Sequence, residues 1–128
     1  MKSRDSQVRL KLFQVNEKRR QVLQLDMMLA DFERMAGELD NQIGSEERKS
    51  GITDTNHFAY PTFAKAARQR RDNLIVSQRD LKTQREAAAA NLTLAEEELA
   101  KAEQLESRDN KAREPVNDMM AAPRMAMG

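Results

Sequence analysis

Apolar side chains recur at every seventh position through the first part of the chain. The series is Val8, Val15, Val22, Leu29, Ala36 and Ile43, and a second position of the same repeat holds Leu25, Phe32 and Leu39. A heptad pattern kept over six repeats is typical of a helix that packs along another helix. We therefore predict a first long helix over about residues 4–49. Lys11 and Lys18 take the second position in the earlier heptads, so the apolar stripe is looser there.

A second heptad series predicts a second helix. It consists of Ala67, Leu74, Leu81, Ala88, Ala95 and Ala102, with Leu92 and Leu99 at the partner position and Arg71, Gln78 and Arg85 at earlier partner sites. Between the two series, Gly51 suits a helix C-terminal cap and residues 53–56 are turn and N-cap types. Pro61 suits a first helical turn. These signals predict a loop over 50–60 and a helix over about 61–113.

Two long helices joined by a short loop predict an all-α fold, a long two-helix antiparallel coiled-coil hairpin over residues 1–113. At about 1.5 Å per residue, each arm would be roughly 70 to 75 Å long. Residues 114–128 contain Pro115, Pro123 and four methionines, and we predict a disordered C-terminal tail there.

The charge distribution predicts the same antiparallel pairing. Residues 1–20 carry seven basic and two acidic side chains, a net of +5, whereas residues 21–50 carry three and seven, a net of −4. Residues 65–85 carry seven basic and two acidic, net +5, and residues 86–106 carry one and six, net −5. Folding about the loop places opposite charges together in both halves. Such surface pairs are each worth only about 0.2 to 1 kcal/mol, so they favour one orientation more than they stabilise it.

Composition limits the classes of function. With 34% charged and 39% hydrophobic residues, the chain predicts helices that bury one narrow stripe rather than a thick core. The net charge of +1 provides no global field toward nucleic acid or an anionic membrane. There is no Cys, hence no disulfide or thiol chemistry, and the chain starts with no apolar run typical of a signal peptide or membrane span. We expect a cytoplasmic protein.

Candidate catalytic or metal chemistry is sparse. His57 is the single histidine, and we expect it to cap or pack in the loop rather than to bind a metal. The acidic run Glu96, Glu97 and Glu98 is interpreted as a solvated face, since successive helical residues point in different directions. The basic run Arg68, Arg70 and Arg71 is interpreted as complementary to the acidic part of the first helix, not as a nucleic-acid site. We predict no enzyme activity, no cofactor, no metal and no small-molecule substrate.

The loop end is the main candidate for a functional region, because Phe58, Tyr60 and Phe63 gather three of five aromatics within six residues. One interpretation is that they pack on each other and on Ile43 to close the hairpin. The other is that they stay exposed and act as interface anchors, which rigid aromatic side chains do well. Both roles are compatible.

The chain resembles the FliJ family of flagellar type III export proteins, in its alphaproteobacterial branch. The resemblance runs from residue 2 to about residue 105 and is carried by the segments 2–4, 12–15, 17–22, 28 and 31–35, and most specifically by Ser50-Gly51-Ile52-Thr53-Asp54 and His57-Phe58-Ala59-Tyr60-Pro61-Thr62. It implies an antiparallel coiled coil similar to the central stalk of rotary ATPases. The short tail after Glu114 departs from the family pattern.

The resemblance also implies partners and a location. The implied partners are the hexameric flagellar export ATPase, the cytoplasmic part of the membrane export gate and, in some members, export chaperones. The implied location is cytoplasmic, peripheral to the inner membrane at the flagellar base, with membrane association only through partners. Applied to this chain, the resemblance implies that the open end of the hairpin contacts the ATPase ring through Arg4, Arg9, Lys18, Arg19 and Arg20. It implies that the loop end contacts the export gate through Gln42, Phe58, Tyr60 and Phe63.

The alternative is a coiled-coil holdase of the prefoldin kind, which would clamp unfolded clients. Prefoldin subunits need strands between their helical arms, and residues 50–61 are too few to supply them.

Overall fold

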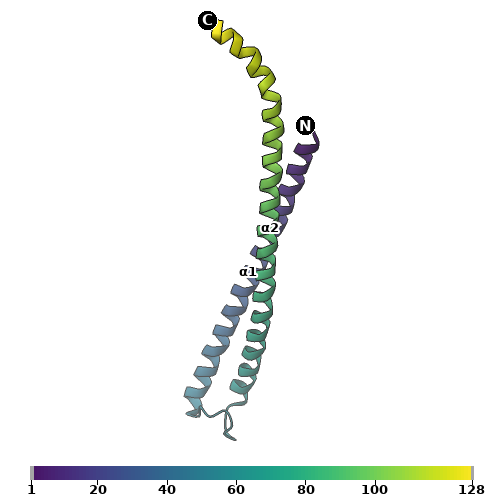
Figure 1. Ribbon diagram of the computed structural model, residues 1–128. Helices are drawn as coiled ribbons and strands as arrows, with labels where there is room; N and C mark the ends of the chain where they lie inside the picture. Colours follow the sequence, from purple (N-terminus) through teal and green to yellow (C-terminus); the bar gives the residue numbers. More distant parts are fainter. Residues whose placement is uncertain (1, 128) are drawn as a thin grey trace. The chain divides into compact units, whose positions relative to one another are not determined.

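The chain forms two helices joined by one loop. The computed structural model describes the backbone of residues 2–127 and the side chains of residues 3–112. Helix α1 spans Lys2–Ser50 and helix α2 spans Thr62–Met127, and no strand occurs between residues 2 and 127 (Figure 1). The predicted all-α, two-helix antiparallel hairpin is therefore confirmed.

The ends of the helices at the loop follow from local chemistry. Gly51 has a positive φ of 73° and its N–H donates to the carbonyl of Glu47 over 2.8 Å, the left-handed cap that the sequence predicts. At the other side of the loop, the carbonyl of Pro61 accepts from the N–H of Lys65 over 3.0 Å. Pro61 lies immediately before the first residue of α2, so this helix begins one position later than predicted.

Helix α2 continues to Met127, beyond the end predicted near residue 113. Methionine and alanine are the commonest residues of the segment after residue 113, and both favour helix. The side chains of the predicted tail, residues 114–128, lie outside the described residues, so the disorder of that tail stays a prediction.

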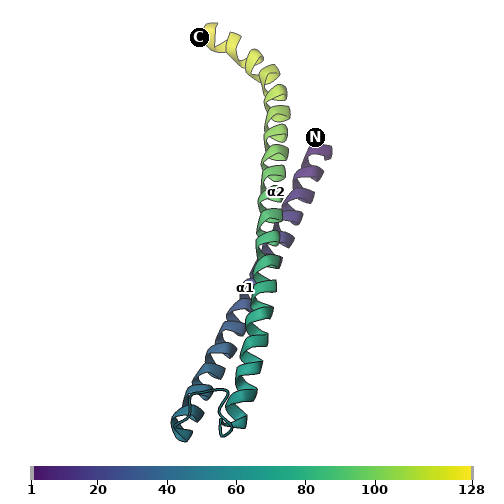
Figure 2. The same ribbon diagram turned by 60° about the horizontal axis from the view of Figure 1, so that its bottom comes forward.

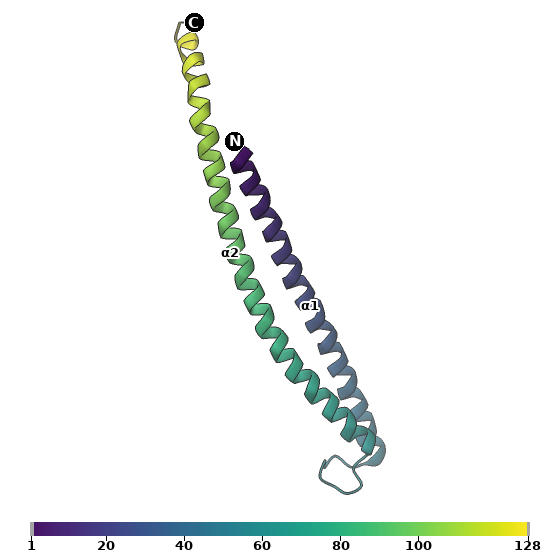
Figure 3. The same cartoon turned by 90° about the vertical axis from the view of Figure 1, so that its right-hand side faces the viewer.

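The two helices divide into two compact units. The loop unit comprises Gln21–Ala88, and the terminal unit comprises Met1–Arg20 with Ala89–Gly128. The loop unit contains the connection between the helices, which lies between their lower ends in Figure 2 and stands clear of them in Figure 3. Figure 3 shows the paired segments of the terminal unit, with the start of α1 in purple beside the green part of α2.

Predicted heptad positions form most of the core of each unit, and Tyr60 and Ala64, which were not in the predicted series, are buried with them. In the loop unit the buried apolar side chains are Val22, Ala36, Ile43, Tyr60, Ala64, Ala67, Leu81 and Ala88. In residues 3–20 and 89–112 of the terminal unit they are Val15, Ala95 and Ala102, of which Val15 is fully buried. No polar or charged side chain among residues 3–112 is buried. The core is thus one apolar seam, as expected for a pair of helices without a second layer.

Ion pairs between the helices establish the antiparallel register. They join Asp26 to Arg85, Asp40 to Arg71 and Glu47 to Arg68 in the loop unit, and Arg4 to Asp109, Lys11 to Glu98 and Arg19 to Glu96 in the terminal unit. In every pair the two residue numbers add to between 109 and 115. The predicted antiparallel matching of charge blocks is therefore confirmed in each unit.

Over the part of the chain that the structure describes, neither helix contains a stretch both long enough and apolar enough to span a bilayer.

Candidate partner-binding site

The loop between the helices is held by its own short-range hydrogen bonds. The N–H of Asn56 donates to Asp54 Oδ1 over 2.9 Å, and the N–H of His57 donates to the carbonyl of Asp54 over 3.1 Å. The N–H of Ala59 donates to His57 Nδ1 over 3.0 Å. These are the turn contacts expected of Asx side chains, and His57 takes the predicted capping role.

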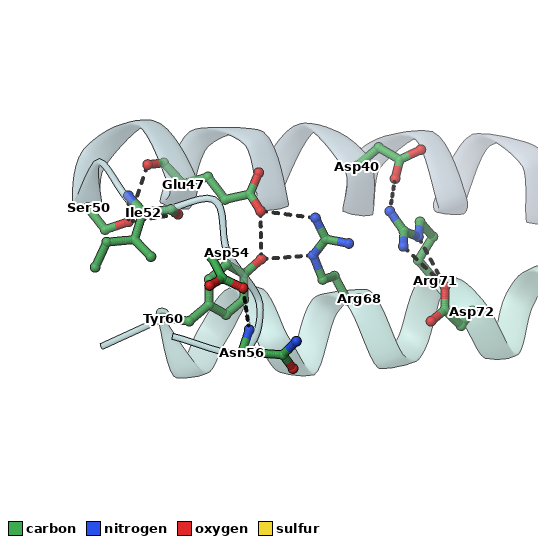
Figure 4. A network of polar contacts seen from close by, with 10 residues as sticks. All are labelled: Asp40, Glu47, Ser50, Ile52, Asp54, Asn56, Tyr60, Arg68, Arg71 and Asp72. Atoms are coloured by element: carbon green, nitrogen blue, oxygen red, sulfur yellow. Dashed lines mark hydrogen bonds and ion pairs between the residues drawn. The ribbon is translucent and has the colours of Figure 1, made fainter. Parts of the chain in front are cut away.

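A three-residue network fastens the end of this loop to both helices (Figure 4). The Tyr60 hydroxyl donates to Glu47 Oε2 over 2.8 Å and accepts from Arg68 Nε over 2.8 Å, and Arg68 Nη2 donates to the same carboxylate oxygen over 3.0 Å. The Arg68 guanidinium also lies 5.9 Å from the centre of the Tyr60 ring. α1, the loop and α2 each contribute one residue, so the network fixes where the loop leaves and rejoins the helices.

The network shifts the ionisation of its members. The hydrogen bond from Tyr60, followed by that from Arg68, lowers the pKa of Glu47. Hydrogen bonds to Tyr60 and then to Glu47 raise the pKa of Arg68. Both shifts favour the charged forms, because each hydrogen bond stabilises a charged group in a half-buried position.

The predicted loop contacts divide into two kinds. The prediction of Tyr60 as an exposed partner contact is wrong: Tyr60 is 7% exposed, because its ring closes the core and its hydroxyl is used by Glu47 and Arg68. Phe58 is 96% exposed and Phe63 is 54% exposed. The ring of Phe58 stacks on His57 at 4.8 Å between centroids. Tyr60 thus packs in the hairpin, whereas Phe58 and Phe63 stay exposed, and their role as interface anchors stays a prediction.

The fourth predicted loop-end contact, Gln42, is exposed and lies beside an apolar groove that sequence reasoning missed. The groove has a volume of about 470 Å³ and runs between α1 and α2 of the loop unit. Phe32, Met35, Leu39 and Leu74 form its apolar lining, and Glu38, Gln42, Arg70, Asn73 and Ser77 complete it. An apolar groove with a polar rim between two helices is a common site for a docking helix.

The two sides of α1 next to the seam differ in charge. On the side that carries the ion pairs, the residue directly after the second seam position is charged in five consecutive repeats: Arg19, Asp26, Glu33, Asp40 and Glu47. On the groove side, the residue directly before the main seam position is uncharged in six consecutive repeats: Gln7, Gln14, Gln21, Met28, Met35 and Gln42. This difference in charge can be read from the sequence, and it could have indicated which side of α1 carries the groove.

The predicted ring contacts all lie in the terminal unit, in different environments. Arg4 donates to Asp109 over 3.0 Å, Arg19 to Glu96 over 3.4 Å, and Arg20 pairs with Glu17 over 3.0 Å. Lys18 is half-buried and lines a small surface pocket with Gln14 and Leu94. Arg9 is exposed and has no ion pair with any residue in the range 3–112. The contacts of Arg4 and Arg19 with α2 therefore give them a structural role as well.

The basic run of α2 pairs with acids of α1 as predicted, and two residues of the acidic run, Glu96 and Glu98, also pair with α1 although that run was interpreted as a solvated face. Arg71 donates to Asp40 over 3.0 Å and Arg68 to Glu47, so two of the three arginines of the basic run face acids of α1. Hydrogen bonds to Asp40, and less to Asp72, raise the pKa of Arg71. In the acidic run, Glu98 accepts from Lys11 over 2.8 Å, which lowers the pKa of Glu98.

Comparisons with protein-family models, with curated proteins and with solved structures found no match to the chain. The fold defines the class as a two-helix antiparallel hairpin.

Proposed function

We propose that this chain is a stalk and adaptor of the flagellar type III protein export apparatus, located in the cytoplasm at the flagellar base. In this proposal it binds the hexameric export ATPase at its terminal unit and the cytoplasmic part of the membrane export gate at its loop unit. Export chaperones are further candidate partners. The chain itself would carry no catalytic group.

The main support for the proposal is that Phe58 is exposed on a loop that is held in place by hydrogen bonds. The segment 50–62, where the resemblance to the FliJ family is most specific, is fastened through Tyr60 and presents Phe58 with 96% of its surface exposed. Leaving a large aromatic side chain in water has no benefit for folding. A rigidly held aromatic instead makes a good anchor, because little conformational entropy is lost when it is buried by a partner.

Binding measurements with the purified chain, the export ATPase and the cytoplasmic part of the gate test this proposal. The double variant Phe58→Ala/Phe63→Ala is expected to bind the gate at least about 30-fold more weakly, the loss typical of interface hot spots. Stimulation of the ATPase should stay unchanged. The control is Met27→Ala, which removes an exposed apolar side chain (68%) that lies neither in the loop nor in the lining of the groove.

The terminal unit is tested in the same assay by Arg9→Ala/Arg20→Ala, which should weaken ATPase binding and leave gate binding intact. Arg79→Ala, an exposed arginine of the loop unit, is its control. Gate binding that survives in the loop variant at full strength would show that the loop assignment is wrong. Suppression of client aggregation without binding to either partner would replace the proposal by the holdase function.

A further inference from the structure

The groove of the loop unit has an acidic wall and a basic wall. Glu38 of α1 and Arg70 of α2 both line it. The Glu38 side chain is 59% exposed, and its ion pair with Arg34 lies within α1. Arg68 and Arg71 pair with acids of α1, whereas Arg70 has no acidic partner among the side chains of residues 3–112. On one side of the groove Arg70 is therefore available to a second molecule, and on the other side the exposed carboxylate of Glu38 can accept a second partner in addition to Arg34.

The apolar lining of the groove is incompletely covered. Phe32, Met35, Leu39 and Leu74 are all half-buried although they occupy seam or neighbouring positions. Two helices form only one layer, and stable domains normally bury such a face against a second layer. The opposite side of α1 is occupied by charged positions and their ion pairs, so the groove side is the one that suits a second layer.

Glu38 and Arg70 are placed so that the groove face is complementary in charge to the same face of a second copy. The pairing of Asp40 with Arg71 shows that Glu38 and Arg70 lie within about one helical turn, about 5 Å, of the same level along the unit. A twofold axis parallel to the helices and above the groove would set α1 of one copy against α2 of the other. Glu38 of each copy would then meet Arg70 of the second copy, and the contact would occur twice.

We propose that the groove is the face at which two copies of this chain associate side by side, in the same direction, as a four-helix layer around Phe32, Met35, Leu39 and Leu74. The dimer is closed, because one twofold axis uses both copies of the face. This association involves only the chain itself and does not depend on the proposed function. Since it covers Gln42, a gate contact at Gln42 would require the free chain.

Analytical ultracentrifugation of the full chain tests the association. The wild type should be a dimer in the high micromolar range. Glu38→Arg and Arg70→Glu should each weaken dimerisation by at least about tenfold, because each replaces two attractive contacts by two repulsive ones. The double variant Glu38→Arg/Arg70→Glu restores opposite charges at both contacts and should dimerise like the wild type. Circular dichroism shows that each variant remains helical.

Mixing the two single variants is the sharper test. In a mixed dimer the two substituted side chains would face each other at one contact, and the native Glu38 and Arg70 would face each other at the second. Both contacts would then be attractive, so the mixture should dimerise where each variant alone does not. Lys65→Glu, the same charge change in the same basic region but outside the groove, should have no effect. A wild type that is monomeric throughout, or a double variant and a mixture that both stay monomeric, would overturn the proposal.

Discussion

The loop unit and the terminal unit use the same two helices but differ in what fills their seams. In the loop unit the buried side chains include Ile43, Tyr60 and Leu81, and a hydrogen-bonded network closes one end. Among residues 3–20 and 89–112 of the terminal unit the buried side chains are Val15 and two alanines, and Lys11 and Lys18 occupy the second seam position. Because stabilisation grows with the apolar area removed from water, the loop unit is the more stable half and the terminal unit the more adaptable one.

Shortening a buried side chain in each unit tests this difference most strongly. Ile43→Ala removes a side chain that is 3% exposed and should destabilise the protein by about 2 to 5 kcal/mol, from lost burial and the remaining cavity. Val15→Ala in the terminal unit should cost about 2 kcal/mol, because fewer methyl groups are lost. Urea unfolding followed by circular dichroism measures both.

Hydrogen exchange then locates the effect of each change. Ile43→Ala should increase exchange in residues 21–50 and 62–88, and Val15→Ala should increase it in residues 2–20 and 89–112. A larger cost for Val15→Ala than for Ile43→Ala would reverse the proposed order of stability between the units.

The network at the loop predicts the next largest effect. Tyr60→Phe keeps the buried ring but removes the hydroxyl that links Glu47 and Arg68. The free energy of unfolding should fall by about 1 to 2 kcal/mol, as expected for lost hydrogen bonds to charged groups. Phe58→Ala is the matched aromatic control and should change stability by less than about 0.5 kcal/mol. Equal costs for the two variants would mean that the network does not stabilise the loop unit.

Acid should destabilise the two units to different extents, and this difference should be smaller than the effects of the substitutions above. The pKa of Glu47 is lowered in the folded loop unit, so its contribution is present above the unfolded-state pKa of about 4.3 and is lost as the pH falls through the lowered value. The pKa of Glu98 is lowered in the same way in the terminal unit. Glu106, also in the terminal unit, has a raised pKa because of its hydrogen bond with Asp5, so its contribution is present at low pH and lost as the pH rises.

Hydrogen exchange across this acidic range should therefore show protection falling further in the loop unit than in the terminal unit, where the shifts of Glu98 and Glu106 oppose each other. Glu47→Gln should remove most of the acid sensitivity of the loop unit. If both units lose protection equally in the wild type and in Glu47→Gln, these carboxylates are not its source.

Particular residues show how far the sequence could predict this structure. The heptad series located both seams, since Val15, Ile43, Ala67 and Ala95 are buried as their spacing requires. Gly51 marked the end of α1, because its positive φ is a property of the backbone at that one position. The end of α2 was less predictable. Pro115 indicated a helix end near residue 113, but the residues around it favour helix and α2 continues to Met127.

The candidate site was predictable only in part. Spacing placed Phe58, Tyr60 and Phe63 together, but a loop has no periodicity that tells which ring faces inward. Tyr60 is buried because Glu47, thirteen residues before it, and Arg68, eight residues after it, converge on its hydroxyl. The groove likewise requires two helices in register before Met35 and Leu74 lie on the same surface.

The sequence by itself therefore determined the helical periods, the position of the turn and the antiparallel pairing, because these depend on repeating apolar positions and on charge blocks that act over short ranges along each helix. The tertiary structure alone decided which loop aromatic is buried, which arginine of the basic run keeps no acidic partner within residues 3–112, and where an apolar groove opens. Those features arise from side chains distant in the sequence, and their burial and pairing exist only once the two helices lie in register.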